Sequence, residues 1–153
     1  MGVRHDIVRL EHSFQKPAGR VFAAWTSTEA LSRWYVPGET GWWSSMEEHE
    51  FRVGGLKRLS FGPSDSVTYE EDCRYEDIVP DQRIVYSMTI SAESRRLTVS
   101  LVTVEFAGVG ASTTVILTDQ MAILDGADTV GDRKQGWIEV FQKLGAEVAG
   151  SQR

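Results

Sequence analysis

The sequence has few of the features that cross-link or anchor a protein. Its 153 residues contain one cysteine, Cys73, which excludes an intrachain disulfide and agrees with a reducing compartment. No apolar stretch approaches the ~20 residues of a membrane span, and the N-terminal residues lack the apolar core of a signal peptide. These absences predict a soluble, cytoplasmic protein with no membrane span.

Positive charge is also scarce. The formal net charge is −6 at pH 7, whereas binding to nucleic acid requires a basic face for the phosphates. The adjacent basic pairs Lys57-Arg58 and Arg95-Arg96 are interpreted as solvated strand ends. The charge therefore argues against a nucleic-acid partner.

Motifs for catalysis and for metal binding are missing. The chain has no Gly-x-Ser-x-Gly, His-Glu-x-x-His or Cys-x-x-Cys motif, and no two histidines lie four residues apart. A metal site made of His12, Glu47 and His49 is one interpretation of the acidic stretch at 47–50; a solvated strand face is the other, and is favoured. We predict neither a metal nor a cofactor.

Strand-like sequence fills most of the chain. Alternating apolar and polar residues predict strands over 5–15, 46–53, 56–61, 67–78, 83–91, 96–107 and 111–119. Turn residues at Gly54-Gly55, Gly62-Pro63 and Pro80-Asp81 separate several of these strands. Strands joined by such short turns indicate an antiparallel sheet.

Helical spacing is confined to the two ends of the strand region. Pro17 predicts the start of a short helix, and Thr26 with Glu29 predicts the capping box of a second one, which Pro37-Gly38 ends. A long closing helix, with Asp132 and Gln135 as its expected cap pair, carries one apolar stripe: Trp137, Val140, Phe141, Leu144 and Val148. Because Gly136 and Gly145 weaken this helix, a curved sheet must hold the stripe.

These segments resemble the helix-grip superfamily, which unites START, Bet v 1-like and other SRPBCC proteins. Within it, the chain is most similar to bacterial proteins related to the C-terminal domain of the Hsp90 ATPase activator Aha1. The residues that carry the resemblance are Pro17, Val21, Phe22, Trp25, Thr26, Leu31, Trp34 and Pro37, then the segments 51–55, 75–86, 118–120, 124–126 and 136–137. The similarity spans about residues 5–149.

The resemblance implies an α+β helix-grip fold. We expect one START/Bet v 1-like domain over residues 1–153, with an antiparallel sheet of six or seven strands curved around the long C-terminal helix. Two short helices should follow the first strand. Edge strands leave both a monomer and a homodimer open.

The same resemblance implies a cavity between the sheet and the C-terminal helix. We therefore predict binding of a small hydrophobic or amphipathic molecule, with plain core packing as the alternative for each residue. Segments 38–46 and 119–131 are expected to control the entrance. The expected walls are Phe22, Trp25, Trp34, Phe51, Tyr86, Met88, Trp137 and Phe141.

Two other functions remain open. The first is an enzyme of the cyclase, dehydratase or hydrolase type that uses a cavity carboxylate, with Asp72 and Glu50 as candidates. The strand at 70–77 has two sides, and the sequence does not decide which of them faces inward. One side carries Asp72, Arg74 and Glu76, and the other carries Glu71, Cys73, Tyr75 and Asp77. The second is a module that contacts an Hsp90-type chaperone; in Aha1, however, ATPase stimulation also needs an N-terminal domain for which this chain has no room.

Overall fold

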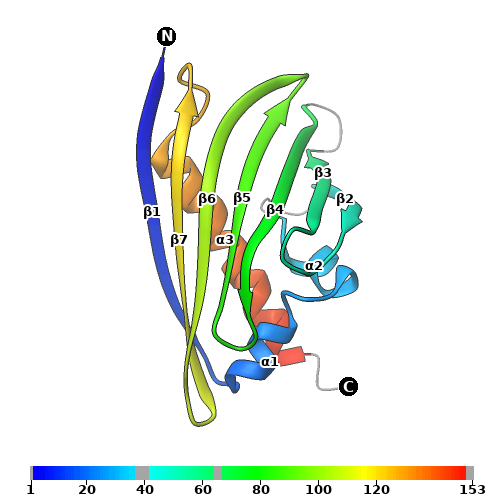
Figure 1. Cartoon of the computed structure of the whole chain (residues 1–153), viewed down its shortest axis with the longest axis vertical. Coiled ribbons are helices and arrows are strands. Elements are labelled where there is room, and N and C mark those ends of the chain that lie inside the picture. The colour runs from blue at the N-terminus through cyan, green and yellow to red at the C-terminus, as the bar shows by residue number, and fades with distance from the viewer. Residues whose placement is uncertain (1, 37–41, 64–66, 151–153) are drawn as a thin grey trace.

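The computed structural model describes residues 2–36, 42–63 and 67–150 (Figure 1). Within these residues the fold is α+β, with a seven-stranded antiparallel sheet and a long C-terminal helix, α3. The strands are β1 Val3–Phe14, β2 Trp43–His49, β3 Leu56–Gly62, β4 Tyr69–Val79, β5 Arg83–Ala92, β6 Arg95–Val109 and β7 Ser112–Leu124. The helices are α1 Ala18–Ala23, α2 Thr28–Trp34 and α3 Val130–Gly150. The helix-grip prediction is confirmed, with seven strands.

The sheet is an open one, in the order β1-β7-β6-β5-β4-β3-β2. Strands β1 and β2 are its two edges, and the short helices α1 and α2 carry the chain from one edge toward the other. Helix α3 packs on β1 and α2, and Figure 1 shows it crossing one face of the sheet toward α1. Among the described residues, no helix is both long and apolar enough to cross a membrane.

The sheet curves because several strands contain irregularities. The pairing register shifts at Glu47 in β2, at Glu76 in β4 and at Leu97 in β6, and each of these is an extra residue relative to the paired strand. An extra residue of this kind bends a strand and increases its twist. The bend turns the inner face around α3.

The β2–β3 hairpin explains the Gly54-Gly55 signal. Gly54 adopts φ +85°, a left-handed conformation that side chains other than glycine rarely take. A Cβ atom on Gly55 would collide with the carbonyl oxygen of Glu50. Both positions therefore require glycine.

The helix caps differ from the prediction. At α2 the cap is Ser27, whose Oγ accepts from the Ala30 amide at 3.0 Å, while Thr26 Oγ1 donates to the Ala23 carbonyl. The predicted box of Thr26 and Glu29 is shifted by one residue from the true cap. At α3 the Oγ1 of Thr129 accepts from the amide of Asp132, so that carboxylate lies inside the first turn instead of capping the helix with Gln135. The predicted stop at Pro37-Gly38 lies outside the described residues.

The apolar stripe of α3 is confirmed, and every predicted member is buried. Leu144, with 0% exposure, belongs to the buried hydrophobic core. Arg133 is buried as well, on the same face and one turn before Trp137. The stripe is thus apolar along most of its length and charged at its N-terminal end.

We expect Leu144→Ala to lower the free energy of unfolding by about 2–5 kcal/mol, because it leaves a cavity where the stripe meets the sheet. Gln142→Ala, at an exposed position of the same helix, should change it by less than about 0.5 kcal/mol. Urea unfolding followed by circular dichroism measures both. Equal losses in the two variants would contradict the packing of α3 described above.

Candidate functional site

A cavity of about 640 Å³ lies between the inner face of the sheet and the N-terminal half of α3. Strands β3 to β6 form one wall, α3 forms the opposite wall, and residues 126–129 of the β7–α3 connection close one side. Exposed residues such as Trp42 and Asp132 belong to the lining, so the cavity opens to the surface there.

Most of the lining surface is apolar, and aromatic and aliphatic side chains contribute to it. Trp42 lies nearly parallel to Tyr69, with ring centroids 6.3 Å apart, and Phe61 stacks against the same tyrosine at 5.6 Å. Tyr35 and Trp137 contact each other edge to face at 6.2 Å. The aliphatic members are Met88, Ile90, Leu97, Ala127 and Val140.

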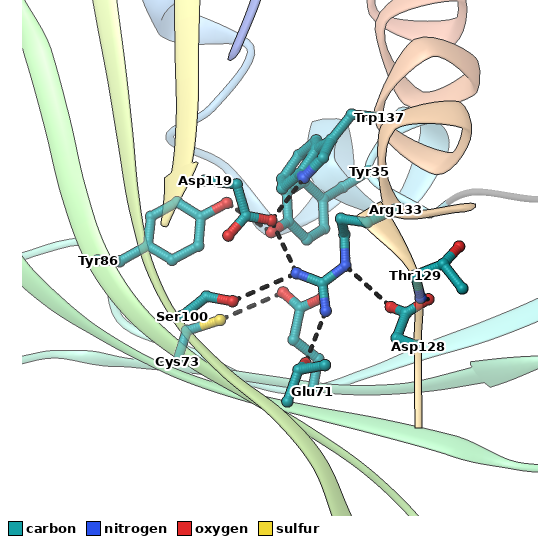
Figure 2. A network of polar contacts seen from close by, with 11 residues as sticks. Tyr35, Glu71, Cys73, Tyr86, Ser100, Asp119, Asp128, Thr129, Arg133 and Trp137 are labelled. Carbon is teal, nitrogen blue, oxygen red and sulfur yellow. Dashed lines mark hydrogen bonds and ion pairs between the residues drawn. The ribbon is translucent and has the colours of Figure 1, made fainter. Parts of the chain in front are cut away.

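A buried ion pair forms the polar end of the cavity (Figure 2). Arg133 Nη1 lies 2.7 Å from Asp119 Oδ2, and these two residues are 9% and 0% exposed. The indole N–H of Trp137 donates to the same carboxylate oxygen at 2.9 Å. Helix α3 is thereby fastened to β7 by a charge-assisted contact from two successive turns.

The remaining N–H groups of Arg133 also face oxygen atoms. Nη1 donates to Ser100 Oγ at 3.3 Å, Nη2 donates to Thr98 Oγ1 at 2.6 Å, and Nε lies 3.4 Å from Asp128 Oδ2. The guanidinium is therefore held between β6, β7 and the connection before α3. Such a network keeps a buried cation solvated by protein groups.

A second buried ion pair, Lys57 with Glu71, lies beside the first. The ammonium of Lys57 is 3.8 Å from Glu71 Oε2, and it stands over the rings of Tyr35 and Tyr86 at 3.6 and 4.0 Å. The two phenol groups share a hydrogen bond of 2.6 Å. Burial lowers the pKa of Lys57, and burial together with the Glu71 charge raises the pKa of both tyrosines.

Cys73 completes this polar group without being reactive. Its thiol is buried and donates to Glu71 Oε2 at 3.2 Å. Burial, and secondly the charge of Glu71, raise the pKa of Cys73 well above its usual range. A thiol that stays protonated is a poor nucleophile.

Two of the eight predicted wall residues, Met88 and Trp137, line the cavity. The other six, Phe22, Trp25, Trp34, Phe51, Tyr86 and Phe141, are outside its lining and belong to the packed core or its border. Trp25 packs edge to face on Trp34 with centroids 4.6 Å apart, and Phe22 packs likewise on Phe106 at 5.3 Å. These rings fill the end of the molecule near α1 and α2.

The predicted cavity carboxylates are not in the cavity. Asp72 faces the outer side of β4, where it pairs with Arg58 at 2.8 Å, and Glu50 is exposed near Arg52. The inward side of β4 is the alternate one, which places Glu71 in the lining. The sequence did not decide which side of this strand faces inward, and the structure shows that it is the side of Glu71.

The two predicted entrance segments, 38–46 and 119–131, contribute in part to the cavity. Trp42 and residues 126–129 line it, and residues 38–41 lie outside the described residues.

The sequence interpretation did not assign Lys57, Asp119 or Arg133 to the site and left the direction of Glu71 open, although each of these four residues occupies a position of core parity. Arg133 precedes Trp137 by one helical turn on the apolar stripe. Lys57 alternates with buried Leu59 and Phe61, and Asp119 alternates with Leu117 and Met121. A charged residue at a position where the strand or helix pattern otherwise places buried apolar residues was the signal that could have identified these side chains.

The residues considered for a metal site are not brought together. His12 lies on β1 and His49 on β2, the opposite edges of the sheet. In the part of the chain that the structure describes, no three His, Cys, Asp or Glu side chains are grouped to hold a metal ion. His49 instead contacts Tyr75 Oη at 2.9 Å and Thr28 Oγ1 at 3.2 Å.

Comparison with known proteins assigns the family. The family model described as Activator of Hsp90 ATPase homolog 1-like protein matches residues 15–149. The chain belongs to this family. Curated proteins gave no match.

Solved structures from bacteria share both the sequence pattern and the fold. The protein Mll3558 from Rhizobium loti is 31% identical, with a TM-score of 0.86 over 96% of this chain and 99% of that one. A protein from Rhizobium leguminosarum is 29% identical with the same TM-score over 96% of each chain. CV1439 from Chromobacterium violaceum is 26% identical, with a TM-score of 0.81 over 93% of this chain and 96% of that one.

We expect Asp119→Asn to lower the free energy of unfolding by about 3 kcal/mol, because it leaves the buried guanidinium of Arg133 without its nearest countercharge. Asp72→Asn makes the same chemical change in an exposed pair and should cost less than about 1 kcal/mol. Urea unfolding at neutral pH compares the two. A loss in Asp119→Asn no larger than that in Asp72→Asn would show that the buried pair does not hold the fold.

A pH dependence follows from His49. Burial, and secondly the charge of Lys57, lower the pKa of His49 from 6.5 to about 4. The neutral ring contributes stability that is fully present above pH 6.5 and is lost as the pH falls toward about 4. We expect His49→Gln to lose less stability than the wild type over that interval, whereas His12→Gln, at an exposed edge, should follow the wild type. Parallel curves for wild type and His49→Gln would overturn the assignment.

Proposed function

We propose that the protein binds a small hydrophobic or amphipathic molecule in the cavity between β3–β6 and α3. The observation that carries the proposal is a cavity of about 640 Å³ with aromatic walls and one polar end. Small-molecule sites are typically of this size, mostly apolar, with a few polar groups that fix orientation. The buried Cys73 thiol fits the proposed cytoplasmic location.

The polar end gives the cavity an orientation. Glu71 and Thr98 on the sheet wall and Arg133 on the α3 wall are buried, whereas Trp42, which stacks on Tyr69, is exposed at the opening. An amphipathic molecule can bury its chain against the rings and direct its polar group to the charged residues. A purely apolar molecule would leave those charges beside a group that cannot solvate them.

Acid–base catalysis on the bound molecule is a second candidate, and Glu71 favours it. This carboxylate borders the cavity and is only 6% exposed, with the ammonium of Lys57 at 3.8 Å. Glu71 would then have the role of cavity carboxylate that the sequence interpretation gave to Asp72 and Glu50. Turnover of a bound compound that is lost in Glu71→Gln, with binding retained, would establish this activity.

The family description supplies a third candidate, contact with an Hsp90-type chaperone. Such contact would use the outer surface and would not depend on the cavity. A variant with a filled cavity therefore separates it from ligand binding, since chaperone contact should survive the change.

We expect Ile90→Trp to weaken binding of the neutral fluorescent probe N-phenyl-1-naphthylamine at least about tenfold, because Ile90 lines the cavity and a larger ring would occupy it. Trp137→Ala, which removes a wall, should also weaken binding. Fluorescence titration measures the dissociation constant of each variant.

Val99→Trp is the matched control. Val99 is 42% exposed and lies on the adjacent strand, opposite Thr89, so the same ring is added to the outer face. Its affinity should equal that of the wild type. If Ile90→Trp, folded by circular dichroism, bound the probe as tightly as Val99→Trp, the cavity would not be the binding site.

A further inference from the structure

Carboxylates outnumber cations around the cavity. Among the lining residues that the structure describes, four are carboxylates, Glu71, Asp128, Asp132 and Glu139, and one is a cation, Arg133. Directly behind the lining, Asp119 pairs with Arg133 and Lys57 pairs with Glu71. Asp132 and Glu139 both lie on α3, where Asp132 is exposed at the opening and Glu139 is partly exposed. A charged ligand therefore meets an excess of negative charge.

Arg133, the one cation among the described lining residues, already donates most of its N–H groups to protein atoms. Both N–H groups of Arg133 Nη1 donate, to Asp119 and Ser100, and one of the two N–H groups of Nη2 donates to Thr98. Its Nε faces Asp128. Because a bidentate contact needs two N–H groups, a carboxylate or phosphate headgroup could form one only by displacing one of these partners, and it would then lie near the Asp128 carboxylate.

The aromatic walls favour a cation for a separate reason. The face of an aromatic ring attracts positive charge when the cation lies within about 6 Å of its centre. The fold already uses this contact, since the ammonium of Lys57 stands 3.6 Å from the centroid of Tyr35, a residue of the cavity lining. Trp42, Tyr69 and Trp137 add further ring surfaces to the lining.

We propose that the ligand of this cavity is an amphipathic cation, an apolar body that carries a protonated amine or a quaternary ammonium group, and that Asp132, Glu139 and the aromatic walls select it. This inference rests on the proposed ligand-binding function and names its chemical class. The apolar body contacts Met88, Ile90 and the rings, and the positive group lies among the carboxylates.

The experiment compares three molecules that share one octyl chain: octyltrimethylammonium, 1-octanol and octanoate. Each is titrated at about neutral pH against the protein loaded with N-phenyl-1-naphthylamine, and displacement of the probe gives the dissociation constants. We expect the ammonium compound to bind at least about fivefold tighter than the alcohol, and octanoate to bind weakest. The preference for the ammonium compound should shrink between about 0.01 M and about 0.15 M salt, because salt screens charges at the mouth.

Two double variants separate local from global charge. Asp132→Asn with Glu139→Gln removes two carboxylates at the cavity, and Glu11→Gln with Glu105→Gln removes two from exposed positions on strands β1 and β6. Both change the net charge equally. The first should reduce the ratio of ammonium to alcohol affinity about threefold or more, while leaving alcohol affinity unchanged; the second should leave the ratio unchanged.

The outcomes distinguish this inference from the function on which it rests. If the probe and octanol bind but the ammonium compound binds no better than octanol, or octanoate binds best, the cation preference is wrong and the binding function stands. An equal effect of the two double variants would likewise overturn the role of the mouth carboxylates. If neither the probe nor any octyl compound binds the folded wild type, the proposed function fails and this inference fails with it.

Discussion

The ion pair between Arg133 and Asp119 sets the relation between helix and sheet on which the cavity depends. It joins the first turn of α3 to the middle of β7, and Thr98 and Ser100 extend the contact to β6. Because a buried charge without its partner is costly, the start of α3 has little freedom to move along the sheet. Thr129, which caps the helix, then fixes where the β7–α3 connection ends and where the cavity is closed.

The inner face of the sheet is divided between two kinds of side chain. Toward α1 and α2, rings such as Trp25, Trp34 and Phe106 pack edge to face. These rings do not line the cavity. Toward the start of α3, charged side chains replace part of the apolar stripe. A charged side chain must keep its partners and cannot simply fill space, so the apolar core does not extend into this end. The cavity lies where the packed core gives way to the charge network.

Most of the fold was predictable because its elements repeat simple periods. Alternation along β5 and the stripe of α3 identified strand and helix, and the glycine pair at 54–55 identified a hairpin that no other residue type fits. The caps were displaced by one to three residues, since several Ser, Thr and Asp side chains in sequence can all serve and only the backbone decides among them.

The site was less predictable, for a physical reason. Aromatic residues were expected in the cavity, but rings also pack well against one another, and the sequence does not say which of the two a given ring does. Lys57 was interpreted as solvated and the direction of Glu71 was left open, although both of them, like Asp119 and Arg133, stand in register with core residues. The sequence alone does not say whether Asp72 or Glu71 faces the inside of the sheet, because that depends on how β4 is placed against its neighbouring strands.

The central claim is that ligands enter the cavity beside α3, and the methionine methyl groups report on it directly. Met88 lines the cavity, whereas Met46 lies on β2 and is outside the lining. Methyl NMR of methionine-labelled protein during titration with 1-octanol should move the Met88 resonance in proportion to occupancy and leave Met46 unchanged. Binding that shifts Met46 and not Met88 would place the ligand elsewhere and contradict this account.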